Sequence, residues 1–166
     1  MTAPDGQPVR CALNHFHRTE LKNAVTGPDL MPILCREAAE SGVGIYLHGG
    51  SSSEVVDRPR FNLRCLFPLL NIVGCESPTF QPLSREEDRA VVDRINSSGA
   101  GIVFIGLGAP KQERFAYEHR GGINAVQVCV GAAFDSHSGV RRRVPNWYRE
   151  RGLEWLFRLL QDPRRL

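Results

Sequence analysis

The segment at residues 102–113 constrains the fold of this chain more than any other part of its sequence. It reads IVFIGLGAPKQE, an apolar run that leads through two glycines and a proline into charged residues. A short apolar run bounded by glycine is typical of a strand covered on both faces, and Pro110 suits the first turn of a helix. The segment therefore predicts a buried strand, a turn at Gly106 and Gly108, and a helix over residues 111–119.

The start of that helix is predicted to bind an anion. The first N–H groups of a helix have no intrahelical partner, and the helix dipole adds partial positive charge at the same end. Lys111 adds a full positive charge, and the Gln112 carboxamide offers both donors and an acceptor. Glu113 either complements the helix N-terminus or holds a ribose. A phosphate-bearing ligand fits this combination.

Apolar runs alternate with helical patterns along most of the chain. Strands are predicted at residues 9–13, 43–47, 69–73, 102–105 and 125–130, and helices at 28–41, 85–96 and 111–119. A further helix is expected to begin within residues 51–53, and Pro59 should shorten or restart it. This alternation predicts an α/β, Rossmann-like fold, with a mainly parallel sheet and helices on both faces.

One helix start has a specific signature. Ser84 is followed three residues later by Glu87, which is the spacing of a capping box. We expect the helix that follows to turn Val91, Val92 and Ile95 toward the core.

Length and composition favour one soluble domain. A chain of 166 residues with 42% hydrophobic content suits a single core, so we expect one domain over residues 1–166. No apolar run is long enough to span a bilayer and the first residues lack a signal-peptide pattern, so we expect a cytoplasmic protein. The five cysteines form no C-x-x-C pair and are expected to be buried, reduced thiols: Cys11, Cys35, Cys65, Cys75 and Cys129.

The C-terminal region at residues 141–166, which we expect to be helical, is rich in arginine. Its eight arginines and three acidic residues give a charge of +5, while the remaining 140 residues carry −2. This asymmetry indicates an anionic partner such as a membrane surface, a diphosphate or a nucleic acid, although a solvated helix face explains it equally well. Nucleic acid is disfavoured because no aromatic stacking platform accompanies the arginines.

Three loops should meet at one edge of the predicted sheet. Ligands of such sheets bind beyond the carboxyl ends of the strands, where the sequence places residues 48–53, 106–113 and 131–135. The first loop contains Gly49 and Gly50 after His48, and the third contains Gly131 and Asp135. A single glycine turn is more often only a tight turn, but three at strand ends favour a ligand site.

Several kinds of site are disfavoured. The loop at residues 106–111 is neither a Walker A loop nor a dinucleotide fingerprint. NAD binding and ATP phosphoryl transfer are therefore disfavoured. His15 and His17 alternate on a predicted strand without a third ligand, and no metal site is expected. Asp5 precedes Gly6 just before that strand, and an isolated Asp-Gly pair is usually a turn.

Five motifs nevertheless resemble those of the WecG/TagA/CpsF family of bacterial glycosyltransferases, in the same order and with similar spacing. They are PDGQPV at residues 4–9, VTGPDLM at 25–31, GLGAPKQE at 106–113, GAAFD at 131–135 and GLEWLFRLLQDPRRL at 152–166. Their positions span nearly the whole chain, from residue 4 to residue 166.

The resemblance implies an inverting enzyme that needs no metal or other cofactor. It would move an N-acetylmannosamine-type sugar from a UDP-sugar donor to a polyprenyl-diphosphate-linked N-acetylglucosamine, in the synthesis of teichoic acid or other surface polysaccharide. Asp5 matches the family's general base, and Gln112 matches a contact to the donor diphosphate. The expected donor-binding residues are Thr26, Gly49, Gly50, Gly106, Gly108, Pro110, Lys111, Gln112, Glu113, Gly131 and Asp135.

The arginines are expected to face the acceptor or an anionic membrane surface, with peripheral binding to the inner face of the cell membrane. The residues concerned are Arg141, Arg142, Arg143, Arg164 and Arg165. The family usually has a further N-terminal segment with a threonine that matters in catalysis. Because this chain begins four residues before Asp5, we expect that segment to be missing. An arginine that is common just before the VTG motif is replaced by Asn23-Ala24, with Lys22 the nearest cation.

An alternative therefore stays open. The chain could be a truncated, catalytically silent module that binds a nucleotide sugar or a protein partner. The sequence leaves the sugar, the acceptor and the oligomeric state open, a homo-oligomer included.

Overall fold

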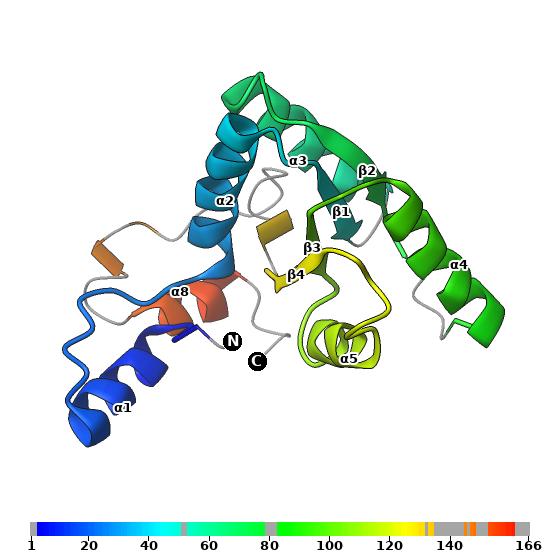
Figure 1. Cartoon of the computed structure of the whole chain (residues 1–166). Coiled ribbons are helices and arrows are strands. Elements are labelled where there is room, and N and C mark those ends of the chain that lie inside the picture. Colours follow the sequence, from blue (N-terminus) through cyan, green and yellow to red (C-terminus); the bar gives the residue numbers. More distant parts are fainter. Residues whose placement is uncertain are drawn as a thin grey trace. The chain divides into compact units, whose positions relative to one another are not determined.

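A computed structural model of the chain describes residues 3–50, 53–78, 83–131, 133–134, 145, 147–148 and 153–161 (Figure 1). It divides into two compact units. The first comprises Met1–Thr26 and Arg142–Leu166, and the second comprises Gly27–Arg141. The two units are described separately below.

The second unit is built on a four-stranded sheet. Its strands are β1 (Ile45–Gly49), β2 (Ile72–Glu76), β3 (Ile102–Gly106) and β4 (Val126–Cys129), in the spatial order β2-β1-β3-β4. All three pairings are parallel. The predicted parallel sheet is confirmed.

Helices cover both faces of this sheet, as predicted (Figure 1). Neighbouring residues of a strand point to opposite faces, so β3 sends Phe104 to one side and Val103 to the other. The Phe104 side is covered by α2 (Gly27–Ser41) and α3 (Ser53–Leu66). The Val103 side is covered by α4 (Arg85–Ser97) and α5 (Lys111–Glu118). The fold is therefore α/β, with a central sheet between two helical layers.

Two predictions around α3 are wrong. Pro59 neither shortens nor restarts the helix, which runs continuously from Ser53 to Leu66 with Pro59 fully buried inside it. Burial of the proline ring offsets the one backbone hydrogen bond that a proline removes. The next strand begins at Ile72 rather than at residue 69, because the chain turns after α3 and leaves Leu69 82% exposed.

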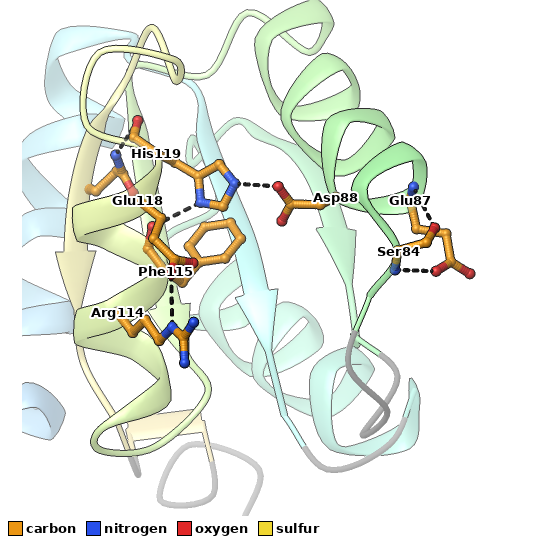
Figure 2. Close-up of polar contacts among 8 residues, drawn as sticks. Ser84, Glu87, Asp88, Arg114, Phe115, Glu118 and His119 are labelled. Carbon is orange, nitrogen blue, oxygen red and sulfur yellow. Dashed lines mark hydrogen bonds and ion pairs between the residues drawn. The ribbon is translucent and has the colours of Figure 1, made fainter.

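The predicted capping box of α4 is confirmed (Figure 2). The Ser84 hydroxyl accepts the Glu87 N–H at 3.2 Å, and the Glu87 carboxylate accepts the Ser84 N–H at 2.7 Å. These two bonds hold the pKa of the exposed Glu87 below its usual value. Val91 and Ile95 are buried as expected, and Val92 is half-buried.

The first unit contains a helix where a strand was predicted. Residues 9–13 lie within α1 (Gln7–His17), so His15 and His17 are on a helix and not on one strand face. Val9, Leu13 and Phe16 follow helical spacing, a pattern that a five-residue window at 9–13 does not reveal. Farther along the chain, α8 (Glu154–Gln161) lies within the region that was expected to be helical.

Side chains of α1 hold the chain that returns after it. Arg10 donates to the carbonyls of Leu21 and Lys22 at 3.2 and 2.7 Å, and the Asn14 amide donates to Leu21 at 2.9 Å. The backbone N–H of Val25 donates to the Pro4 carbonyl at 3.1 Å. These contacts make residues 4–25 a closed loop around one helix.

Candidate functional site

The strand order places a topological switch point between β1 and β3. These strands are neighbours, but β2 lies outside β1 and β4 lies outside β3. In open parallel sheets, ligands bind outside the carboxyl ends of the strands at such a point. We call the carboxyl ends of β1, β3 and β4, with the residues that directly follow them, the carboxyl edge.

The turns after β1 and β3 touch each other at the carboxyl edge. Gly49 is paired with Gly106, and the Gly50 N–H donates to the Gly106 carbonyl at 3.1 Å. A Cβ on Gly49 would lie 2.6 Å from the Gly106 Cα, and a Cβ on Gly106 would collide with the Phe134 ring. Close packing alone thus requires glycine at both positions. The N–H of Gly50, a residue expected to bind the UDP-sugar, is already hydrogen-bonded within the protein.

Gly108 has a different reason to be glycine. Its φ of +77° lies in the left-handed region, and a Cβ there would meet nothing within 4 Å. The Gly108 carbonyl accepts the Gln112 N–H at 3.0 Å, which closes the turn into α5. The predicted helix begins at Lys111, with Pro110 as the residue before it rather than inside its first turn. Ala109, Pro110 and Lys111 are exposed at this end.

Gln112 joins two of the three predicted loops. Its side chain is buried, with the residue 7% exposed. The carboxamide oxygen accepts the Gly131 N–H at 2.9 Å, and the carboxamide nitrogen donates to the exposed Glu113 carboxylate at 2.7 Å. The structure therefore brings Gln112 and Gly131 together as predicted, and both ends of the carboxamide take part in protein contacts.

The N-terminus of α2 also lies at the carboxyl edge. A Cβ on Gly27 would collide with the backbone of Val130, the residue after β4. Only glycine permits this approach between helix and strand end. Sequence reasoning missed the contact, although Gly27 stands inside the VTGPDLM motif.

A largely buried carboxylate, that of Glu76, contacts two side chains beside the turn after β1. His48 Nδ1 lies 3.0 Å from Glu76 Oε1. Arg94 donates its Nε–H to Glu76 Oε2 at 3.0 Å, and its Nη2 lies 2.9 Å from the same oxygen. Burial raises the pKa of Glu76, but the hydrogen bonds and charges of His48 and Arg94 outweigh it and hold that pKa below its usual value. Burial, with Glu76 nearby, raises the pKa of Tyr46 to about 12. The sequence singled out His48 but neither Glu76 nor Arg94.

The remaining predicted residues fall into two groups. Asp5 and Thr26 are in the first unit. Asp5 is exposed and precedes Gly6, which is the N-cap of α1 and does not lead into a strand, while Thr26 is buried. The other predicted side chains lie outside the described residues: Asp135, Arg141, Arg142, Arg143, Arg164 and Arg165.

The cysteines are only partly as expected. None of the five forms a disulfide, but Cys11 and Cys65 are exposed, so the prediction of buried thiols is wrong for these two. Burial raises the pKa of Cys35 to about 12 and that of Cys75 to about 11. Within the described part of the chain, no cluster of His, Cys, Asp or Glu could hold a metal ion. Nor does any described helix have the length and apolar character to cross a membrane.

Comparison with known families agrees with the motifs. The family model described as "Glycosyl transferase WecG/TagA/CpsF family" matches residues 1–166 of the chain.

Proposed function

The chain belongs to the WecG/TagA/CpsF family of glycosyltransferases, and from this membership we propose the reaction that it catalyses. It transfers an N-acetylmannosamine-type sugar from UDP to a polyprenyl-diphosphate-linked N-acetylglucosamine, with inversion at the anomeric carbon. The observation that carries the proposal is the convergence of the turns after β1, β3 and β4 at the switch point of the sheet.

We assign the donor diphosphate to the start of α5. Gly108 allows the turn that exposes this helix end, and Lys111 places a flexible ammonium beside it. A diphosphate carries at least two negative charges, so the helix dipole and Lys111 both stabilise it, and they stabilise the departing UDP more as its charge grows. Gln112 would contribute indirectly, by holding Gly131 and Glu113 in place.

Asp5 is the proposed general base. An inverting transfer needs a carboxylate that takes the proton from the acceptor hydroxyl as that oxygen attacks the anomeric carbon. Asp5 is exposed at the start of α1, where a bound acceptor can reach it, and Thr26 is proposed as a substrate contact. The support for both is their match to the family's motifs at residues 4–9 and 25–31.

The acceptor is amphiphilic, which bears on where the enzyme acts. We propose that it works in the cytoplasm at the inner face of the cell membrane, with the arginines of residues 141–166 near anionic headgroups. Each arginine near such a surface contributes roughly 1 kcal/mol, so several together suffice for reversible binding.

Calorimetry with UDP tests the donor site. Binding that is weakened at least about tenfold by Lys111→Ala is the expected result, because one charge contact at a diphosphate is lost. No detectable binding of UDP or a UDP-N-acetylhexosamine by the purified chain would contradict the proposal.

A second experiment tests the base and separates the alternative function. Asp5→Asn should abolish transfer to the lipid-linked acceptor and leave UDP affinity unchanged. Asp93→Asn makes the same chemical change on the exposed side of α4 and should affect neither. If the unaltered chain binds UDP but transfers no sugar, the silent binding module is the better description.

A further inference from the structure

His48, Glu76 and Arg94 form a chain of contacts that the donor-site proposal leaves without a role. His48 directly precedes Gly49 at the end of β1, and it pairs in register with Glu76, the last residue of β2. The next residue, Ser77, donates its hydroxyl to the Gly50 carbonyl at 3.1 Å. Two successive residues, Glu76 and Ser77, therefore hold His48 and Gly50, the residues on either side of Gly49.

The geometry of these contacts shows which atom carries the hydrogen between His48 and Glu76. The carboxylate of Glu76 can only accept, so the hydrogen between it and His48 Nδ1 belongs to the ring. The His48 side chain is 1% exposed and that of Glu76 is 18% exposed, whereas Arg94 reaches in from solvent with 54% exposure. A single carboxylate thus links a buried imidazole to an exposed guanidinium.

The face of the His48 ring is also held. It stacks on Phe115 with ring centroids 4.8 Å apart and an angle of 26°. Phe115 belongs to α5, the helix that begins with Lys111 and Gln112. The imidazole is therefore fixed along one edge by β2 and on one face by α5, and its own backbone leads into Gly49.

We infer that Glu76 is a positioning residue for the donor site, which acts by holding the His48 ring and thereby setting the Gly49–Gly50 turn relative to the start of α5. The inference rests on the proposed function for its effect on UDP. Its structural part concerns only the turn. Arg94 neutralises the Glu76 carboxylate, so that the contact between Glu76 and His48 can stay largely buried.

A purely structural role explains the arrangement less well. A largely buried carboxylate with its hydrogen-bond partners seldom stabilises a site more than apolar residues of similar size would, and at the other end of the β1–β2 pairing Ile45 lies opposite Ile72. What the hydrogen bond to Glu76 does provide is one defined orientation of the His48 ring, because it forms at Nδ1 and at no other ring position. Orientation matters most beside a turn whose Gly50 N–H must meet the Gly106 carbonyl.

The same helical layer contains a matched control (Figure 2). His119 Nε2 lies 2.9 Å from Asp88 Oδ2, and the His119 ring packs on Phe115 with centroids 4.2 Å apart. This is also a buried histidine bonded to a carboxylate, and its ring packs against Phe115 at a tilt of 37°. It differs in that α4 supplies the carboxylate and the histidine directly follows α5, so neither partner belongs to the strands that lead into the Gly49–Gly50 turn.

The test compares Glu76→Gln with Asp88→Asn in the full chain. Because the carboxamide introduced by Glu76→Gln is uncharged and cannot accept from both neighbours as a carboxylate does, this variant should raise the Kd for UDP about tenfold and speed exchange of the Gly50 amide about fivefold. Asp88→Asn should change neither by more than about twofold, even if it lowers the melting temperature equally.

Two further variants keep the test decisive. Arg94→Met removes an exposed side chain at little risk to folding, and it should raise the Kd for UDP about threefold. His48→Asn keeps an N–H donor near the Nδ1 position and should retain more affinity than His48→Leu, which a merely space-filling role would not produce.

The outcomes are separable. If Glu76→Gln folds, and both UDP affinity and Gly50 exchange match those of Asp88→Asn, the positioning role is wrong. If the unaltered chain does not bind UDP, the proposed function fails, and Gly50 exchange alone then decides whether Glu76 positions the turn. Slower or unchanged exchange in both Glu76→Gln and Arg94→Met would overturn it.

Discussion

The side-chain oxygen of Gln112 accepts the backbone N–H of Gly131 at 2.9 Å, which joins the first turn of α5 to the residue that follows Val130 after β4. This single bond connects two loops that are 19 residues apart in sequence. Because the Gln112 side chain is buried, water has little access to replace its oxygen as the acceptor for the Gly131 N–H.

Replacing Gln112 by Leu should therefore destabilise the protein by about 1–3 kcal/mol, the usual cost of leaving a poorly hydrated donor without an acceptor. Urea unfolding followed by circular dichroism measures the change. Glu113→Gln is the control, since an amide oxygen there can still accept from Gln112 and the residue is exposed. Equal stability of Gln112→Leu and the unaltered chain would show that this bond does not hold the loops.

Two glycines of the carboxyl edge should respond differently to alanine. Gly49→Ala forces a Cβ to within 2.6 Å of the Gly106 backbone, so it should cost more than about 2 kcal/mol. The added Cβ of Gly108→Ala meets open space, so only the left-handed backbone should lower the stability, by about 1–2 kcal/mol. Thermal unfolding of both variants gives the order. A Gly108→Ala variant less stable than Gly49→Ala would contradict these reasons.

Stability should depend on the ionisation of Glu76 in acid. Its pKa in the folded protein is below the usual value of 4.5, so the unfolded chain takes up the proton more readily. The stabilisation is fully present above about pH 4.5 and is lost as the pH falls through the lower, folded-state pKa. His48, Arg94 and Tyr46 are the groups that face the carboxylate.

Urea midpoints measured from about pH 6 down to about pH 3 check this dependence. Glu76→Gln should flatten that part of the profile, because the variant has no proton to take up at this site. An unchanged slope in the variant would mean that other carboxylates account for the acid sensitivity.

Four of the five thiols should differ in how fast they react. Cys11 and Cys65 are exposed and should be modified quickly by a thiol reagent at about pH 8, close to the ordinary thiol pKa. Cys35 and Cys75 should react slowly, because burial keeps both protonated with pKa values of about 12 and 11. Timed labelling with mass spectrometry of the peptides distinguishes them. Fast labelling of Cys35 in the folded chain would show that its helix opens readily.

Sequence patterns predicted those elements whose signals are local. The capping box at Ser84, the strand at residues 102–105 and the turn at Gly108 each depend on neighbouring residues, and each is found in the structure. The strand predicted at residues 9–13 failed because Val and Leu suit a helix as well as a strand. Its helical spacing becomes visible only when Phe16 is included.

The proposed donor site was likewise predictable only in part. That glycines follow β1, β3 and β4 was readable from the chain, and so was the positive start of α5. Which glycines serve close packing was not readable, because Gly49 and Gly106 are far apart in the chain and their contact exists only in the folded sheet. The expectation of one domain over residues 1–166 stays a prediction, as do the roles of Asp5 and Thr26.

The sequence by itself determined the family and most of the alternation of strands and helices, and it predicted the end of the sheet where a ligand should bind. These follow from periodicity, turn residues and motif order, which need no knowledge of distant contacts. Only the tertiary structure decided that Gln112 binds Gly131 and that Glu76 joins His48 to Arg94. Such pairs depend on strand order and register, and a parallel crossover brings together residues whose separation in the chain carries no signal of their contact.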